Sequence, residues 1–372
     1  MRWSKSGKVQ ISEADLAVLS SGAFRDKDWA RPEAWFEATG FPPVSSAMLF
    51  TLLTNRKETN PKLLWAQYRR LLEVSNDLPR YYRQHSREIG GKTRLISQPM
   101  YPLAGYQYWI LKNILERAET TDCAFAYKKG LSLADHARVH RGKRILIKLD
   151  LAHFFDSISY GMVYAVFSEQ MHYPKEGATL LANLCCLDGR LPQGACTSPC
   201  LSNLCMSGID REIQDYCREK GLRYTRYSDD MTFSGERADV RALVKQVERI
   251  LRKRGFSLNY RKIHVEGKGK RHKVTGIVCN DKINTPTDYR RKLRQEMYFL
   301  QKFGPAEHLK RLDDPRYRND AGEADVEKYL SALQGRVAYV LQVDPENGEF
   351  SRYRDLLREI RKARPAPYTI LQ

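Results

Sequence analysis

Apolar residues recur at helical spacing through the first part of the chain and again towards its end. We predict a mostly helical region over residues 1–75 and an amphipathic helix over residues 106–118. A further helix is predicted over residues 239–254, where Gly255 supplies a C-terminal stop. From residue 285 the pattern is again helical and is rich in basic residues.

Shorter apolar runs between these helices have the pattern of strands. Residues 145–149 form a nearly continuous apolar run, which is typical of a buried strand. Residues 222–226 and 231–233 have the pattern of the two arms of a β-hairpin, and residues 81–96 form a basic, strand-rich stretch. This order predicts an α+β fold with helices on one face of an antiparallel sheet.

The net charge of the chain indicates what kind of partner it binds. The 372 residues include 63 basic and 44 acidic side chains, which gives a net charge of +19. Positive charge spread along the chain predicts a polyanionic partner, and nucleic acid is a better candidate than an anionic membrane surface. We expect a cytoplasmic protein, because we find no signal peptide and no apolar run of spanning length. The eight cysteines lack a zinc-ligand spacing and are expected to be free thiols, mostly buried.

The tip of the predicted hairpin carries two adjacent carboxylates, Asp229 and Asp230, in a Tyr-Ser-Asp-Asp sequence. Their repulsion disfavours strand structure, and a divalent cation would offset it. Asp150 ends the predicted buried strand and can meet this tip on a neighbouring strand. Three carboxylates so placed suit a pair of Mg²⁺ ions that bind phosphates and activate a hydroxyl group. The alternatives are a solvated turn and an ordinary strand-ending residue.

The loop at residues 191–204 is a second candidate functional segment. It opens with Leu-Pro-Gln-Gly, in which proline and glycine fix a turn. Gln193 and Ser198 offer neutral hydrogen-bonding groups to a base pair or a sugar. Pro199 suits the first turn of a helix that follows.

In their order and spacing, these segments resemble the motifs of reverse transcriptases. The resemblance rests on Asp150 with Phe154 and Phe155, on the Leu-Pro-Gln-Gly loop, and on Tyr-Ser-Asp-Asp, and it covers roughly residues 80–372. Two further segments narrow it to the retron reverse transcriptases of bacteria.

Residues 274–276 look like the retron Val-Thr-Gly motif. Residues 135–140 are similar to the retron Asn-Ala-x-x-His motif, although His136 stands where that pattern has Asn. This difference puts the usual hydrogen-bonding role of that position in doubt.

The resemblance implies a right-hand polymerase fold. Residues 1–75 would form a helical N-terminal region, residues 76–284 the fingers and a palm with an antiparallel sheet, and residues 285–372 a basic helical thumb. It also implies an RNA-directed DNA polymerase that copies part of a cognate structured non-coding RNA into branched msDNA. Synthesis would start from a guanosine 2′-hydroxyl and use two Mg²⁺ ions, for which Mn²⁺ could substitute. The expected partners are this RNA, the msDNA product, dNTPs and a toxic effector of an anti-phage defence system, but no membrane.

By the same resemblance, the metal ligands are the carboxylates of Asp150, Asp229 and Asp230 and the backbone carbonyl of Leu151. Tyr227 would pack beside the primer end.

The expected nucleotide-binding residues lie in several segments. Lys92 and Arg94 would neutralise the triphosphate, unless they are solvated strand charges. Phe155 would exclude a 2′-hydroxyl, unless it is a core ring, and Gln193 would line the nucleotide pocket. Lys262 could approach the leaving pyrophosphate.

The resemblance also suggests contacts to folded RNA. The candidates come from the two retron-like motifs and from the basic run in the thumb: His136, His140, Val274, Thr275, Gly276, Arg290, Arg291 and Arg294.

Three other functions stay open. The chain could be a reverse transcriptase of another lineage, either intron-related or diversity-generating. It could be a catalytically inactive RNA-binding scaffold, against which the three intact aspartates argue. An RNA-templated RNA polymerase is disfavoured if Phe155 is the sugar gate.

Overall fold

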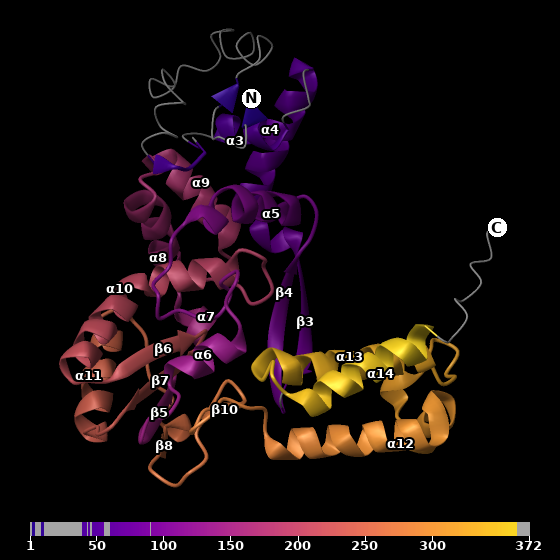
Figure 1. Ribbon diagram of the computed structural model, residues 1–372. Coiled ribbons are helices and arrows are strands. Elements are labelled where there is room, and N and C mark those ends of the chain that lie inside the picture. Colours follow the sequence, from indigo (N-terminus) through magenta and orange to yellow (C-terminus); the bar gives the residue numbers. More distant parts are fainter. Residues whose placement is uncertain are drawn as a thin grey trace.

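The computed structural model describes residues 2–3, 9–10, 39–42, 44, 47–55, 60–89 and 91–362. Figure 1 shows an N-terminal helical part at the top, a four-stranded sheet with its helices at the lower left, and a three-helix unit at the lower right. No helix in the described ranges is both long and apolar enough to cross a bilayer.

A four-stranded antiparallel sheet, which we call the palm sheet, positions the candidate site. Its strands lie in the order β6-β7-β5-β8. Their bounds are Arg223–Tyr227 for β6, Asp230–Gly235 for β7, Ile145–Asp150 for β5 and His264–Glu266 for β8. The strand predicted at residues 145–149 and the predicted hairpin are therefore confirmed.

The two faces of the palm sheet differ in polarity, because side chains alternate along each strand. Ile147, Leu149 and Phe233 belong to the large core beneath helices α10 (Ser198–Glu219) and α11 (Val240–Arg252). Helix α11 confirms the prediction for residues 239–254, with Asp239 as its N-cap.

The opposite face of the palm sheet is more polar. It is covered in part by α6 (Leu133–Val139) and by the short hairpin of β9 (Lys273–Val274) and β10 (Ile277–Val278). The prediction of helices on a single face was therefore incomplete. The reason is that α6 packs its buried Ala134 and Ala137 against Leu146 and the β9–β10 hairpin.

The fingers and the N-terminal helices are formed by elements before β5 and by the segment between β5 and α10. A hairpin of two eight-residue strands, β3 (Tyr82–Ile89) and β4 (Lys92–Pro99), projects down past the sheet in Figure 1. The helices of this part are α3 (Ala47–Thr54), α4 (Pro61–Asn76), η2 (Leu78–Tyr81), α5 (Leu103–Asn113), η3 (Leu115–Arg117), α7 (Phe154–Ser157), α8 (Tyr160–Ala165), the π-helix η4 (Val166–Gln170) and α9 (Lys175–Cys185). Helix α5 begins and ends earlier than predicted for residues 106–118. The two-residue strands β1 (Arg2–Trp3) and β2 (Val9–Gln10) pair with each other.

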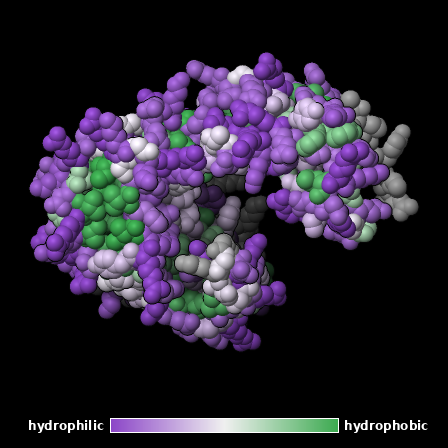
Figure 2. Space-filling model, turned by 90° about the horizontal axis from the view of Figure 1, so that it is seen from below, coloured by the Kyte–Doolittle hydropathy of each residue, from purple (hydrophilic) through white to green (hydrophobic). Residues whose placement is uncertain are grey.

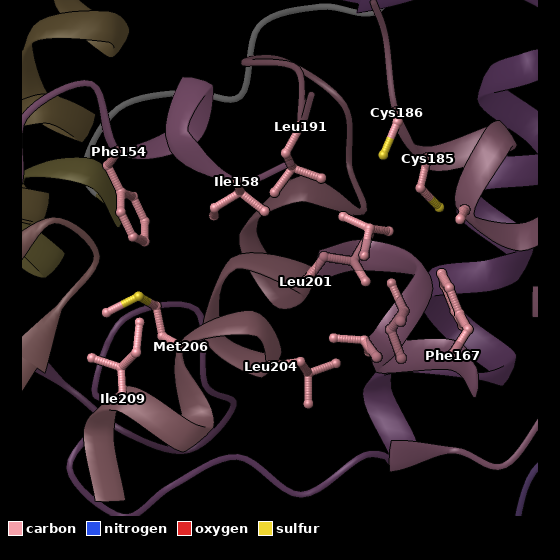
Figure 3. Packing of buried hydrophobic residues seen from close by; sticks show 14 of the residues in the cluster. Phe154, Ile158, Phe167, Cys185, Cys186, Leu191, Leu201, Leu204, Met206 and Ile209 are labelled. Carbon is pink, nitrogen blue, oxygen red and sulfur yellow. The ribbon is translucent and has the colours of Figure 1, made fainter. Parts of the chain in front are cut away.

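One hydrophobic core joins these helices to the palm. Figure 3 shows Leu191 and Ile158 above Leu201 of α10, with the adjacent Cys185 and Cys186 to one side. All eight cysteines are free, as predicted, and five of them are buried. Burial raises the pKa of the Cys186 thiol to about 12, so this thiol is neutral and unreactive at physiological pH.

The C-terminal unit, which is called the thumb below, has a core of its own. It consists of α12 (Thr287–Leu312), which breaks at Gly304 (φ +77°), η6 (Pro315–Tyr317), α13 (Val326–Val343) and α14 (Gly348–Lys362). Buried leucine, valine and aromatic side chains hold these helices together. The boundaries predicted at residues 75 and 284 fall near the end of α4 and the start of α12, and as domain boundaries they stay predictions.

Candidate active site

Strand register brings the predicted carboxylates together at one end of the central strands of the palm sheet. Asp150, the last residue of β5, lies directly opposite Asp230, the first residue of β7. Asp229 occupies the two-residue turn that joins β6 to β7. The Leu151 N–H donates to the Asp229 carbonyl over 3.0 Å, so the chain after β5 is fastened to the turn.

The turn itself has an unusual backbone. Ser228 has a φ of +60°, a left-handed value at the first position of a two-residue hairpin loop. Glycine is favoured there, because other residues pay a steric penalty. Two contacts hold Ser228: its Oγ lies 3.0 Å from the Tyr127 hydroxyl, and its carbonyl accepts from Arg226 Nη1 over 3.0 Å.

A buried ion pair supports the turn from below. Arg226 of β6 and Asp210 of α10 are both 0% exposed, and the guanidinium donates two hydrogen bonds, of 2.9 and 2.7 Å, to the carboxylate. The hydroxyls of Tyr224 and Thr121 also donate to Asp210. Sequence reasoning missed this pair. The only signal is the alternation of β6, which puts Arg226 on the same apolar face as Tyr224.

Positive charge from a neighbouring segment meets the aspartates. Lys262, at the end of η5 (Tyr260–Lys262), forms an ion pair with the buried Asp150. Asn259 Nδ2 donates to the same carboxylate over 3.3 Å. Although Asp230 keeps exposed surface, partial burial and the negative charges of Asp229 and Asp150 raise its pKa to about 6.

Asp150, Asp229 and Asp230 place three carboxylates beside the single ammonium group of Lys262, and burial together with the negative charges of Asp229 and Asp150 raises the Asp230 pKa. Among the described residues, no three Asp, Glu, His or Cys side chains converge closely enough to form a ready-made cation site. The donor set nevertheless fits a divalent cation, because Asp150, Asp229 and Asp230 provide hard carboxylate oxygens whose repulsion a cation would relieve. These are the residues that would hold the metal, and Leu151 stays a predicted backbone ligand.

A cavity of about 650 Å³ opens between the aspartates and the fingers. It brings together Arg94, Gln193, Asp150, Asp229 and Lys262. Two of the predicted nucleotide-binding side chains, those of Arg94 and Gln193, therefore share one cavity with the carboxylates.

The Gln193 loop is held against β4. The Ser97 N–H donates to the Gln193 carbonyl over 2.7 Å. Gly194, at a φ of +123°, passes so close that an added Cβ would lie 2.6 Å from the Ser97 carbonyl oxygen. Ser198 does not offer its hydroxyl to a ligand as predicted, because it is buried and donates to the Pro192 carbonyl over 2.6 Å.

The other two predicted nucleotide-binding residues are Phe155 and Lys92, and Phe155 is not among the residues that line this cavity. Phe155 is half-buried and packs edge-on against Phe154 with ring centroids 5.3 Å apart, and it is Phe154 that lines the cavity. The backbone of Lys92 begins β4, but its side chain lies outside the described residues.

A second cavity, of about 340 Å³, lies on the polar face of the palm sheet. Asp150, Asp230 and Lys262 line it together with Thr275 and Gly276. The Val-Thr-Gly segment thus lies at the end of the sheet that carries Asp150 and Asp230. Val274 does not face this cavity and is only 1% exposed, so its predicted contact with RNA does not fit the structure.

His136 and His140 also do not fit the predicted role in RNA binding. Both are 0% exposed, because α6 turns them towards the polar face of the sheet. Each places its Nε2 2.6 Å from Thr225 Oγ1. Direct contact with RNA would need these side chains to be accessible.

The three arginines of α12 differ in their surroundings. Arg294 donates two hydrogen bonds of 2.7 Å to Glu349 of α14, so its guanidinium is engaged within the thumb. Arg290 is half-buried, whereas Arg291 is exposed, with its guanidinium 3.7 Å from the Asp288 carboxylate. Of the three, Arg291 is the most available to a phosphate.

The molecule is hollowed between the palm and the thumb. Figure 2 shows this hollow from below, with hydrophilic residues over most of the visible surface. A cavity of about 1230 Å³ there is lined by Phe125, Tyr127 and Tyr227 and by Tyr339 of α13. Its volume exceeds the roughly 300–1,000 Å³ that is usual for small-molecule pockets.

Comparisons with known proteins agree with this arrangement. The family model described as reverse transcriptase (RNA-dependent DNA polymerase) matches residues 85–279. The chain is 32% identical to the retron Ec86 reverse transcriptase of Escherichia coli over 225 residues, which cover 59% of this chain and 69% of that protein. It is 26% identical to the retron Mx162 reverse transcriptase of Myxococcus xanthus over 323 residues, 77% of this chain and 62% of that protein.

Similarity to solved structures is weaker. The telomerase of Candida albicans, solved in complex with a TWJ fragment of telomeric RNA, aligns at 10% identity over 80% of this chain and 60% of that chain. The TM-score of this alignment is 0.44.

Proposed function

The chain belongs to the bacterial retron reverse transcriptases, which are RNA-directed DNA polymerases, and on this premise we propose that it copies RNA into DNA at the Asp150–Asp229–Asp230 edge of the palm sheet. One observation carries the proposal: the register that sets Asp150 opposite Asp230, beside a cavity lined by Arg94 and Gln193.

The chain's own groups divide the work of nucleotide transfer. Asp150, Asp229 and Asp230, with the Leu151 carbonyl, would hold two Mg²⁺ ions, or Mn²⁺ in their place. When bound, such ions lower the pKa of the primer hydroxyl and neutralise the leaving pyrophosphate. Arg94 adds positive charge where the triphosphate would lie.

Three further residues position the nucleotide in this proposal. Gln193 is fixed by its loop against β4 and would contact the base or the sugar of the incoming nucleotide. Lys262 lines both cavities at Asp150, so its ammonium group could move from the Asp150 carboxylate to the leaving pyrophosphate. Phe155, which does not line the cavity itself but packs against the cavity-lining Phe154, would exclude a 2′-hydroxyl from the sugar site.

Family membership supports the finer parts of the proposal. We infer that the template is part of a structured non-coding RNA, that the primer is a guanosine 2′-hydroxyl of that RNA, and that the product is branched msDNA. The exposed Arg291 and the accessible Thr275 and Gly276 are the remaining candidates for RNA contacts. A role in anti-phage defence with a toxic effector is proposed on the same ground.

The decisive experiment replaces single carboxylates with amides. Asp229→Asn or Asp230→Asn should lower Mg²⁺-dependent DNA synthesis by about 100-fold or more, because each removes a charged metal ligand. RNA binding should stay nearly unchanged, since binding depends on basic residues elsewhere. Asp215→Asn, at an exposed position of α10, is the matched control. Undiminished synthesis by the Asp229 and Asp230 variants would contradict the site.

Expression of the chain beside its neighbouring non-coding RNA tests the retron part. Recovery of DNA joined to RNA through a 2′–5′ branch is the expected result. Linear cDNA alone would favour an intron-related or diversity-generating lineage.

A further inference from the structure

His136 of α6 and His140, which caps the C-terminus of that helix, belong to a buried hydrogen-bonded chain beneath the Tyr-Ser-Asp-Asp turn. His136 and His140 both contact Thr225 Oγ1 of β6 through Nε2, at 2.6 Å. At one end of the chain, His140 Nδ1 lies 2.7 Å from Ser234 Oγ of β7. At the other end, His136 Nδ1 lies 3.4 Å from Thr275 Oγ1 in the turn between β9 and β10. This chain of hydrogen bonds therefore connects four segments of the palm, which are α6 with its C-cap, β6, β7 and the β9–β10 turn.

The hydrogen-bond directions along this chain depend on one another. Burial lowers the pKa of His136 to about 4 and that of His140 to about 3, so both rings are neutral at physiological pH. Thr225 has one hydroxyl proton, so it donates to one ring and accepts from the other. If His136 donates to Thr225, its Nδ1 accepts from Thr275, and in the reverse order its Nδ1 donates. In either order both nitrogens of His136 are engaged.

His136 also belongs to an aromatic stack. Its ring centroid lies 5.0 Å from that of Phe125 and 5.8 Å from that of Tyr227, with interplanar angles of 28° and 23°. Tyr227 ends β6 directly before the turn and is the register partner of Asp230. The imidazole therefore supports the Tyr227 ring from one side.

Two of the residues that His136 contacts, Thr275 and Tyr227, line different cavities. Thr275 lines the cavity that contains Asp150 and Asp230. Tyr227 lines the large cavity between palm and thumb. His136 is thus a physical link between residues on both sides of the Asp229–Asp230 turn.

We propose that His136 is a positioning residue for DNA synthesis, which holds Tyr227 and Thr275 in register so that the terminal nucleotide of the primer strand is seated against Asp230. This inference rests on the proposed polymerase function. The retron pattern has Asn at this position. An amide offers a donor and an acceptor but no aromatic ring, so the hydrogen bonds and the stack are separable by substitution.

The test uses the full chain, an oligo(dT) primer annealed to poly(rA), dTTP and Mg²⁺. His136→Phe keeps a ring but removes both hydrogen bonds, and we expect it to raise KM for the primer–template about ten-fold. Thr275→Ala removes only the outer bond and should raise the same KM by about three-fold. KM for dTTP should stay unchanged in both, because Arg94 and Gln193 line the cavity of about 650 Å³, which neither Tyr227 nor Thr275 lines. Ser234→Ala, which alters only the His140 end, is the matched control and should keep both KM values.

A purely structural role would give another result. If His136→Phe lowers kcat only in proportion to the loss of folded protein, measured by circular dichroism, and leaves both KM values unchanged, the proposal is overturned. If His136→Phe does not fold, Thr275→Ala decides, and an unchanged primer KM in that variant overturns the proposal as well. Absence of synthesis by the unaltered chain would instead contradict the polymerase function, so the two failures are distinguishable.

Discussion

Replacing Arg226 with methionine should strongly destabilise the palm. Arg226 and Asp210 are both fully buried, with 2.7 Å between Nη2 and Oδ2. Breaking such a pair leaves an uncompensated charge in the interior, at a cost of about 3–5 kcal/mol. The Ser228 carbonyl also loses its donor, which adds about 1 kcal/mol. The expected total of about 4–6 kcal/mol is a large part of the roughly 5–15 kcal/mol by which folded proteins are stable.

A double variant separates stability from the geometry of the turn. Arg226→Met combined with Asp210→Leu removes both charges, so most of the penalty should disappear. Tyr224 and Thr121 then lack an acceptor, and a residual loss of about 1–3 kcal/mol should remain. DNA synthesis should stay reduced in the double variant, because nothing replaces Arg226 at the Ser228 carbonyl.

Urea unfolding followed by circular dichroism measures these differences. The matched control is the exposed pair of Arg218 and Asp215 on α10, whose side chains are 73% and 65% exposed and 3.0 Å apart. Arg218→Met should change the free energy of unfolding by less than about 1 kcal/mol, because solvent screens exposed pairs. If Arg226→Met and Arg218→Met unfold at the same urea concentration, the reasoning from burial is refuted.

Three further predictions concern the site and the thumb. As pH falls through about 6, Asp230 gains a proton, so Mg²⁺ affinity and DNA synthesis should both fall. Lys262→Met should move this acid limb of the pH–rate profile to higher pH, because the lysine charge lowers the Asp230 pKa, and an unmoved limb would count against the assignment. Phe155→Ala should raise the ratio of ribonucleotide to deoxynucleotide incorporation, and an unchanged ratio would remove Phe155 as the sugar gate. Arg291→Ala should lower the slope of log K for RNA against log salt by about 1. Arg294→Ala should mainly lower the melting temperature of the thumb, since Glu349 loses its partner; equal effects on RNA binding would contradict this distinction.

The palm sheet and its carboxylates were predictable because each has a local signature. An apolar run that ends in Asp150 predicts a buried strand. Two adjacent aspartates between strand-like runs predict a hairpin turn whose carboxylates can bind a cation. The approach of Lys262 to Asp150 is less local, since it depends on where η5 lies after α11. The sequence suggested Lys262 only through the reverse transcriptase resemblance.

The buried polar residues were not predictable in this way. His136 and His140 belong to a motif that suggests contact with RNA, and their burial depends on how α6 packs over the sheet. Arg226 has the appearance of a solvent-facing strand residue until Asp210 of α10 is placed beneath it. In both cases tertiary packing, rather than local pattern, decides whether a polar side chain meets solvent or a protein partner.

The strand order of the palm sheet has a consequence for how the protein is synthesised. Strand β5 lies between β7 and β8, so its hydrogen-bonding groups lack both neighbours until residues 230–235 and 264–266 have left the ribosome. At about 5–20 residues per second, the roughly 80 residues that separate β5 from β7 take about 4–16 s to translate. During that interval a nascent apolar strand with two free edges is open to pairing with other chains. The end of the sheet that carries the aspartates is thus assembled late in translation. The yield of folded enzyme should depend on how well β5 is shielded while the rest of its sheet is being made.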